Sequence, residues 1–241
     1  MPGLSWLTTR PVAHRGLHDA AHGVIENTAS AFRAAIAEQF AIECDLQRAG
    51  DGEAMVFHDE TLDRLTQRQG PLAALPSHDL KAVPFKATDD RMMTLGELCD
   101  LVAGRVPLVI ELKSSFNNDT RLAARTADVL KTYAGPVAVM SFDPAMISAI
   151  AGVAPGLPRG IVAERKLLTD HGVATASYLR AVFAARPHFV AWSVRDLPAT
   201  MPLLARYVFG LPLLTWTVRT DADRTRARRW ADQMIFEGFR P

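Results

Sequence analysis

Cysteine is scarce in this chain, which has Cys44 and Cys99 only. Two cysteines in 241 residues make a disulfide framework implausible and favour a reducing compartment. Cys44 stands between Glu43 and Asp45 on a predicted strand, where side chains alternate between the two faces. We therefore expect the two carboxylates to share one face and Cys44 to point the other way, into packing.

An excess of one charge and a long hydrophobic run are also missing. The formal net charge is +1, which excludes a global field that attracts nucleic acid or an acidic membrane. Residues 1–7 lack the basic and apolar segments of a signal peptide. The apolar stretch 201–216 is interrupted by Arg206, Gly210 and Pro212, so it does not read as a membrane span. We expect a cytoplasmic protein without a stable membrane anchor, and any phosphate must bind at a local site.

The elements that the sequence does contain alternate between strand and helix. The apolar stripes predict helices over 27–39, 94–102 and 119–133, and one that begins at Asp143 with Pro144 in its first turn. No Gly-x-Gly-x-x-Gly turn follows the first strand, which weakens a dinucleotide-binding alternative. Eight strand–helix units favour an α/β fold of the (β/α)8 TIM-barrel type, formed by residues 1–241 as a single domain. The expected strands are 12–15, 41–47, 108–112, 137–141, 159–163, 189–194, 213–218 and 233–237.

One segment departs from the alternation. The Asp51-Gly52 turn predicts that 54–57 returns as an extra strand antiparallel to the second, because no helix fits between them. Residues 60–93 are rich in turn formers and charges, and we interpret them as a small insertion after strand two that overhangs a site. A plain long loop is the alternative.

Charged and titratable residues gather at the ends of neighbouring predicted strands. In a barrel the carboxyl ends of the strands carry the active site, so these side chains are expected to converge on one sector of the rim. Each residue alone is as readily structural as functional, and the joint pattern carries the inference. They are His14, Arg15, Glu43, Asp45, His58, Glu111 and Lys113.

These residue types together suit phosphate chemistry. The carboxylates of Glu43, Asp45 and Glu111 form a hard oxygen site that favours Mg²⁺ or Ca²⁺. Zinc is less expected, because both histidines are needed for other work. Arg15 and Lys113 can balance phosphate charge. His14 and His58 titrate near neutrality and can serve as general acid and base.

The chain resembles the glycerophosphodiester phosphodiesterase family in several short segments that follow the family's order. The segments are Ala13-His-Arg-Gly16, Glu26-Asn-Thr28, Ile42-Glu-Cys-Asp-Leu46, Val56-Phe-His-Asp59, Leu62-Asp-Arg-Leu-Thr66, Ile110-Glu-Leu-Lys113, Ser141-Phe142 and Trp216-Thr-Val218. The resemblance implies a barrel with a small insertion after strand two. It also implies the same metal, acid–base and phosphate residues as above. It adds Glu26 and Asn27 as supporting residues and Trp216 as a wall of the pocket.

The chain departs from the family pattern at three positions. The family commonly has Pro at Ile25, Asn at Arg219 and Asp at Glu237. Arg219 adds a cation at the rim, which bears on the alcohol portion that the site accepts. Glu237 is a longer stand-in for the usual carboxylate.

The resemblance implies hydrolysis of a small-molecule glycerophosphodiester to glycerol 3-phosphate and an alcohol such as choline or ethanolamine. The nucleophile is either water or the substrate's own hydroxyl. Two alternatives are a lysophospholipase D-like activity and a non-catalytic phosphodiester-binding protein. The first needs an apolar approach, for which residues 60–93 offer few large side chains. All the charged residues that the chemistry requires are present, which argues against the second. The sequence leaves the oligomeric state open.

Overall fold

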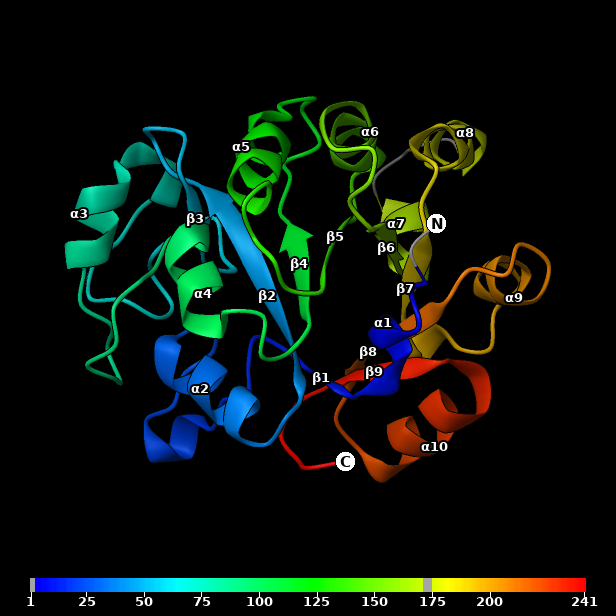
Figure 1. Ribbon diagram of the computed structural model, residues 1–241, viewed down its shortest axis with the longest axis horizontal. Helices are drawn as coiled ribbons and strands as arrows, with labels where there is room; N and C mark the ends of the chain where they lie inside the picture. Colours follow the sequence, from blue (N-terminus) through cyan, green and yellow to red (C-terminus); the bar gives the residue numbers. More distant parts are fainter. Residues whose placement is uncertain (1–2, 171–174) are drawn as a thin grey trace.

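The strands close into a barrel in the computed structural model, which describes residues 3–170 and 175–241 (Figure 1). They form one sheet in the order β1-β9-β8-β7-β6-β5-β4-β2-β3, and β1 pairs with both β9 and β2. Val12 is in register with Ile235 on one side and with Ala41 on the other, which closes the ring. All pairings are parallel except that of β3, which adds antiparallel to β2. The predicted TIM-type barrel with an extra strand is confirmed.

The strand positions follow the sequence prediction closely. The bounds are β1 Val12–Ala13, β2 Ala41–Arg48, β3 Ala54–Val56, β4 Leu108–Leu112, β5 Val137–Ser141, β6 Arg159–Ala163, β7 Phe189–Ser193, β8 Leu213–Val218 and β9 Gln233–Phe236. The first strand is shorter than expected. It stops at Ala13 because the backbone of Arg15 turns into the left-handed region, with a φ of 57°. Gly16 follows with a φ of 82°, a conformation that glycine adopts at little cost.

Helices surround the barrel and connect successive strands (Figure 1). Side-chain caps begin two of the predicted helices: Thr94 and Glu97 form a capping box, and Asp143 accepts from the backbone N–H of Ala145 at 2.8 Å. The helices are α1 Trp6–Thr9, α2 Ala29–Ala37, α3 Ser77–Ala82, α4 Leu95–Val102, α5 Arg121–Leu130, α6 Pro144–Val153, α7 Arg165–Asp170, α8 Thr175–Ala185, α9 Thr200–Tyr207 and α10 Asp221–Trp230. Short 3₁₀ segments are η1 Ala20–His22, η2 Leu72–Ala74 and η3 Val194–Asp196. Within the described residues, none of these helices has the length and apolar character needed to cross a bilayer.

The barrel interior is a packed apolar layer. Inward positions of the strands supply it, and Leu7 of α1 packs against them. Its buried strand residues are Val12, Ala41, Val109, Ala138, Met140, Val162, Phe189, Ala191, Leu214 and Ile235. The intervening positions face the helices, and Cys44 lies buried in that outer cluster, as predicted. Because side chains alternate, the next inward positions beyond this layer face the carboxyl rim.

The segment 60–93 has a core of its own rather than being a plain loop. It contains η2 and α3. Leu62, Leu72, Leu80, Phe85 and Met92 are buried together, and Met55 and Phe57 pack with them. The large apolar side chains on which a lysolipid-binding approach would rely are therefore used internally. That arrangement disfavours the lysophospholipase D-like alternative.

Candidate active site

The predicted functional residues occupy the inward positions directly beyond the apolar layer. On β2 the inward series continues from Ala41 to Glu43 and Asp45. On β4 it continues from Val109 to Glu111, and Lys113 takes the next such position just after the strand ends. Glu43, Glu111 and Lys113 face a cavity of about 310 Å³. Among the residues that line it are His14, Arg15, Glu43, His58, Glu111, Lys113 and Trp216. Asp45, Glu26 and Asn27 are not among the lining residues, but each contacts one that is: Asp45 contacts Lys113, and Glu26 and Asn27 contact Arg15.

The three carboxylates form a buried cluster. Glu43 and Asp45 are each 1% exposed and Glu111 is 8% exposed, and one oxygen from each lies within 4.8 Å of the others. Burial raises the pKa of Glu43 well above its ordinary 4.5, and the negative charges of Asp45 and Glu111 raise it further. Its Oε2 accepts the backbone N–H of Arg15 at 2.9 Å, whereas its buried Oε1 accepts no hydrogen bond from the described residues. An unpaired buried oxygen among like charges fits a divalent cation, so this cluster could hold one.

Asp45 is held in its ionised form by the cations beside it. Burial opposes ionisation, but Lys113 and Arg15 lower its pKa below the ordinary 3.8. Lys113 Nζ lies 2.8 Å from Asp45 Oδ1 and 2.6 Å from Glu111 Oε1, and Arg15 Nε lies 3.2 Å from Asp45 Oδ2. Asn27 donates to Asp45 Oδ2 at 2.9 Å. Arg15 and Lys113 are thereby fixed at the cavity wall as charged groups.

Both histidines have a carboxylate at Nδ1. His14 Nδ1 lies 2.6 Å from Glu237 Oε2, and His58 Nδ1 lies 2.7 Å from Asp59 Oδ1. A carboxylate at Nδ1 favours the tautomer with the proton on that nitrogen and leaves Nε2 for the cavity. Burial lowers the pKa of His58 from its ordinary 6.5, although Asp45 opposes this. His58 is therefore uncharged at pH 7.

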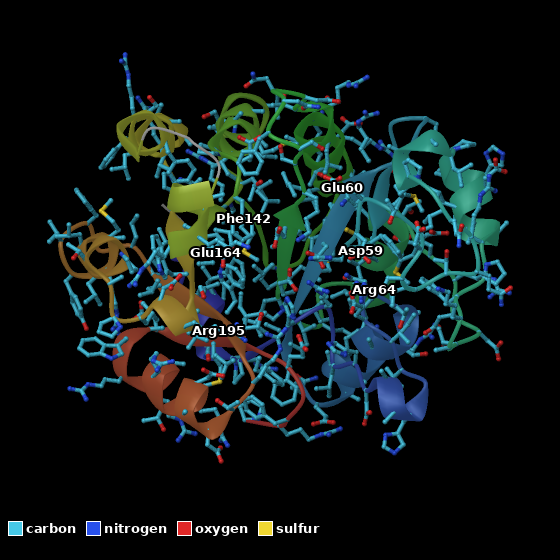
Figure 2. The ribbon with its side chains drawn as sticks, turned by 180° about the vertical axis from the view of Figure 1, so that it is seen from behind. Asp59, Glu60, Arg64, Phe142, Glu164 and Arg195 are labelled. Atoms are coloured by element: carbon cyan, nitrogen blue, oxygen red, sulfur yellow. The ribbon has the colours of Figure 1, made fainter. Side chains whose placement is uncertain are left out.

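Two residues that sequence reasoning left without a role link the two sides of the site. Arg64 donates from Nε to Asp59 Oδ2 at 2.6 Å and from Nη2 to Glu26 Oε1 at 2.7 Å. Glu26 Oε1 also accepts from Arg15 Nη1 at 2.7 Å. A continuous chain of contacts thus joins His58 to Arg15, and Figure 2 labels Asp59 and Arg64 within it. Arg64 lies in one of the segments that resemble the family. It is not on a strand, so side-chain alternation could not predict which way its side chain points.

The two departures from the family pattern at the rim bind one another. Arg219 Nε and Nη2 donate to the two oxygens of Glu237, each at 3.1 Å. Burial opposes ionisation of Glu237, but hydrogen bonds from His14 and Arg219 lower its pKa to about 2. Arg219 therefore neutralises the carboxylate that holds His14, and it also lines the cavity.

Aromatic side chains form the opposite wall of the cavity. Trp216 takes the inward position on β8 above Leu214, and its ring contacts that of Phe142 edge to face, with centroids 5.4 Å apart. Glu164 follows β6 and lines the same wall, and Figure 2 labels it near Phe142. Trp216 thus lines the cavity.

The fold and this rim define a barrel enzyme whose site combines a carboxylate cluster, two cations and a pair of histidines. The sequence pattern of the glycerophosphoryl diester phosphodiesterase family matches residues 14–238, so the chain belongs to that family. The chain is accordingly a phosphoric diester hydrolase that acts on glycerophosphodiesters, as its motifs predicted.

Similar proteins agree with the family assignment. A glycerophosphodiester phosphodiesterase of Caldanaerobacter subterraneus is 30% identical over 65% of this chain and 67% of its own length. One from Bacillus subtilis is 26% identical and covers 95% of this chain and 83% of itself. A phosphodiesterase structure from Oleispira antarctica, in complex with the product sn-glycerol-3-phosphate, superposes with a TM-score of 0.80 at 18% identity. That match covers 96% of this chain and 94% of the other.

Proposed function

We propose that this chain cleaves glycerophosphodiesters into glycerol 3-phosphate and a small alcohol, with Mg²⁺ or Ca²⁺ bound by Glu43, Asp45 and Glu111. The observation that carries the proposal is the unpaired Oε1 of Glu43 in a buried carboxylate cluster, beside a cavity that both histidines share. All the ligand atoms are carboxylate oxygens, which suits a hard cation rather than Zn²⁺. The names of the relatives and the glycerol-phosphate complex of the Oleispira protein support the same substrate class.

A bound cation would polarise a phosphate oxygen and offset negative charge as the phosphodiester reacts. The remaining steps belong to the side chains. Arg15 and Lys113, already charged and fixed by Asp45, bind the phosphate oxygens and stabilise the added charge of the transition state. His58 is uncharged at pH 7, so it takes a proton from the attacking water or substrate hydroxyl. His14, which is oriented by its hydrogen bond to Glu237, gives a proton to the departing alkoxide.

The first test is release of glycerol 3-phosphate from glycerophosphocholine and glycerophosphoethanolamine, followed with a coupled dehydrogenase. We expect release with Mg²⁺ or Ca²⁺ and its loss in a chelator, because the carboxylate cluster cannot by itself offset phosphate charge. Lysophosphatidylcholine serves as the comparison substrate. Release that is unchanged by the chelator would contradict the metal proposal, and faster turnover of the lysolipid would contradict the substrate class.

Replacing Glu237 by glutamine is expected to lower kcat at least about tenfold, with a smaller change in KM. Glutamine retains the size of the side chain but loses the ionised acceptor that holds His14 Nδ1 at 2.6 Å. Steady-state kinetics with glycerophosphocholine measure both constants. Arg219→Met is the companion variant, and it should have the weaker effect because His14 keeps its carboxylate partner. Equal activity of Glu237→Gln and the wild type would show that Glu237 does not position His14.

A further inference from the structure

We propose a second cation site beside the first, formed by His14, His18 and Glu237, at which Zn²⁺ binds and inhibits the enzyme. The site is distinct from the carboxylate cluster and prefers a different class of metal. The binding part of the proposal stands on geometry alone. The inhibition part rests on the proposed role of His14 in catalysis.

The three ligand atoms are already grouped at the mouth of the barrel. His14 Nδ1 lies 2.6 Å and His18 Nε2 lies 3.9 Å from Glu237 Oε2. One ligand atom from each of the three residues lies within 4.8 Å of the other two. Tetrahedral Zn²⁺ with nitrogen and oxygen ligands at about 2.0–2.2 Å separates ligand atoms by roughly 3.3 Å. The distances of 2.6 and 3.9 Å lie on either side of that value, so small side-chain rotations suffice.

Among the residues that the structure describes, the ring nitrogen Nε2 of His18 takes part in no hydrogen bond that would explain its position. Nε2 is buried and makes no hydrogen bond within the described residues, although the side chain as a whole is 16% exposed. The backbone holds it in place, because Gly16 and Leu17 donate to the carbonyls of Glu43 and Ala31 at 3.2 and 3.0 Å. A buried imidazole nitrogen that makes no hydrogen bond within the described part of the chain is suited to binding a metal ion.

The ligand set separates this site from the carboxylate cluster. Two imidazole nitrogens and one carboxylate oxygen suit Zn²⁺, whereas Mg²⁺ and Ca²⁺ prefer oxygen ligands. Arg219 opposes a cation here, because it donates to both oxygens of Glu237. Its side chain is 47% exposed, so Nη2 can leave Oε2 for solvent while Nε keeps Oε1.

Zinc at this site would disable His14. A metal on Nδ1 takes the position of the proton that Glu237 holds, and the ring can then no longer carry a proton on both nitrogens. The carboxylate cluster uses none of these three residues, so a high concentration of Mg²⁺ should not relieve the effect.

The test is a calorimetric titration of Zn²⁺ into tag-free enzyme at saturating Mg²⁺, compared with His18→Gln. We expect the variant to keep its activity with Mg²⁺ and to bind Zn²⁺ at least about tenfold more weakly, because it lacks one ligand. His22→Gln is the matched control, since His22 lies in the same loop with an 80% exposed side chain and outside the site. The concentration of Zn²⁺ that halves activity should rise in parallel with the dissociation constant in His18→Gln only.

Equal Zn²⁺ affinity of the wild type and His18→Gln would overturn the site. Relief of zinc inhibition by Mg²⁺ would overturn it as well, because the ions would then compete at the carboxylate cluster. Tight binding that depends on His18 but leaves turnover unchanged would retain the site and reject the inhibition. Since calorimetry does not require turnover, a failure of the proposed phosphodiesterase activity remains distinguishable from a failure of this site.

Discussion

Replacing His58 by alanine is expected to lower kcat for glycerophosphocholine at least about a hundredfold, which corresponds to about 2.7 kcal/mol of transition-state stabilisation. The imidazole lines the cavity, its Nδ1 is held by Asp59, and burial keeps it uncharged at pH 7. Alanine removes the proton acceptor but leaves the carboxylate cluster and both phosphate-binding cations in place. Turnover at saturating substrate and Mg²⁺ measures the effect.

His78→Ala is the matched control for this prediction. His78 lies in α3, within the same segment after β3, and its side chain is 78% exposed. It should leave kcat unchanged. Circular dichroism of His58→Ala should match the wild type, because a partly exposed side chain is removed. A kcat within a few-fold of the wild type would reject His58 as an acid–base residue.

The barrel and most of the candidate site were predictable because both depend on the two-residue alternation of side chains along the strands. Alternation along β2 and β4 assigns Glu43, Asp45 and Glu111 to the inward side of the barrel. In the structure their carboxylates lie close together. The same alternation assigned Cys44 to the outer cluster, where it lies. A strand period fixes direction without knowledge of contacts.

Residues carried by loops had no such period. Asp59 and Arg64 follow β3 in an irregular segment, whose own buried cluster packs against Met55 and Phe57. The end of β1 was also misjudged, because the left-handed turn at Arg15 serves a hydrogen bond from its N–H to Glu43. Long-range contacts, rather than local propensity, decide such positions.

Two deviations that looked independent in the sequence prove to be one feature. An extra cation at Arg219 and a longer carboxylate at Glu237 lie 18 residues apart and form a bidentate pair. The carboxylate of Glu237 and the guanidinium of Arg219 compensate each other's charge. The longer Glu237 reaches His14, and Arg219 offsets its charge. We therefore regard Arg219 mainly as the partner of Glu237 and only secondarily as a contact for the leaving alcohol.

Replacing Glu43 by glutamine is expected to abolish metal-dependent activity by at least about a hundredfold while leaving the metal-free protein as stable as the wild type or more so. Glutamine can still accept the N–H of Arg15, but it no longer adds a negative charge beside Asp45 and Glu111. Wild-type protein should show a rise in melting temperature with Mg²⁺ or Ca²⁺, because an ion that binds only the folded state stabilises it. Glu43→Gln should lose that rise.

The pH dependence sharpens the same test. The folded pKa of Glu43 lies above the ordinary 4.5, so folded protein retains a proton that the unfolded chain has lost. The contribution of Glu43 to the free energy of unfolding of the metal-free wild type therefore falls as the pH rises from 4.5 through the folded pKa. The Glu43→Gln variant should lack that fall. Glu53→Gln is the control, since Glu53 pairs with Arg125 outside the cavity. A metal-induced rise in melting temperature that survives in Glu43→Gln would exclude Glu43 as a ligand. A lower melting temperature of the metal-free variant would show instead that its charge is compensated within the protein.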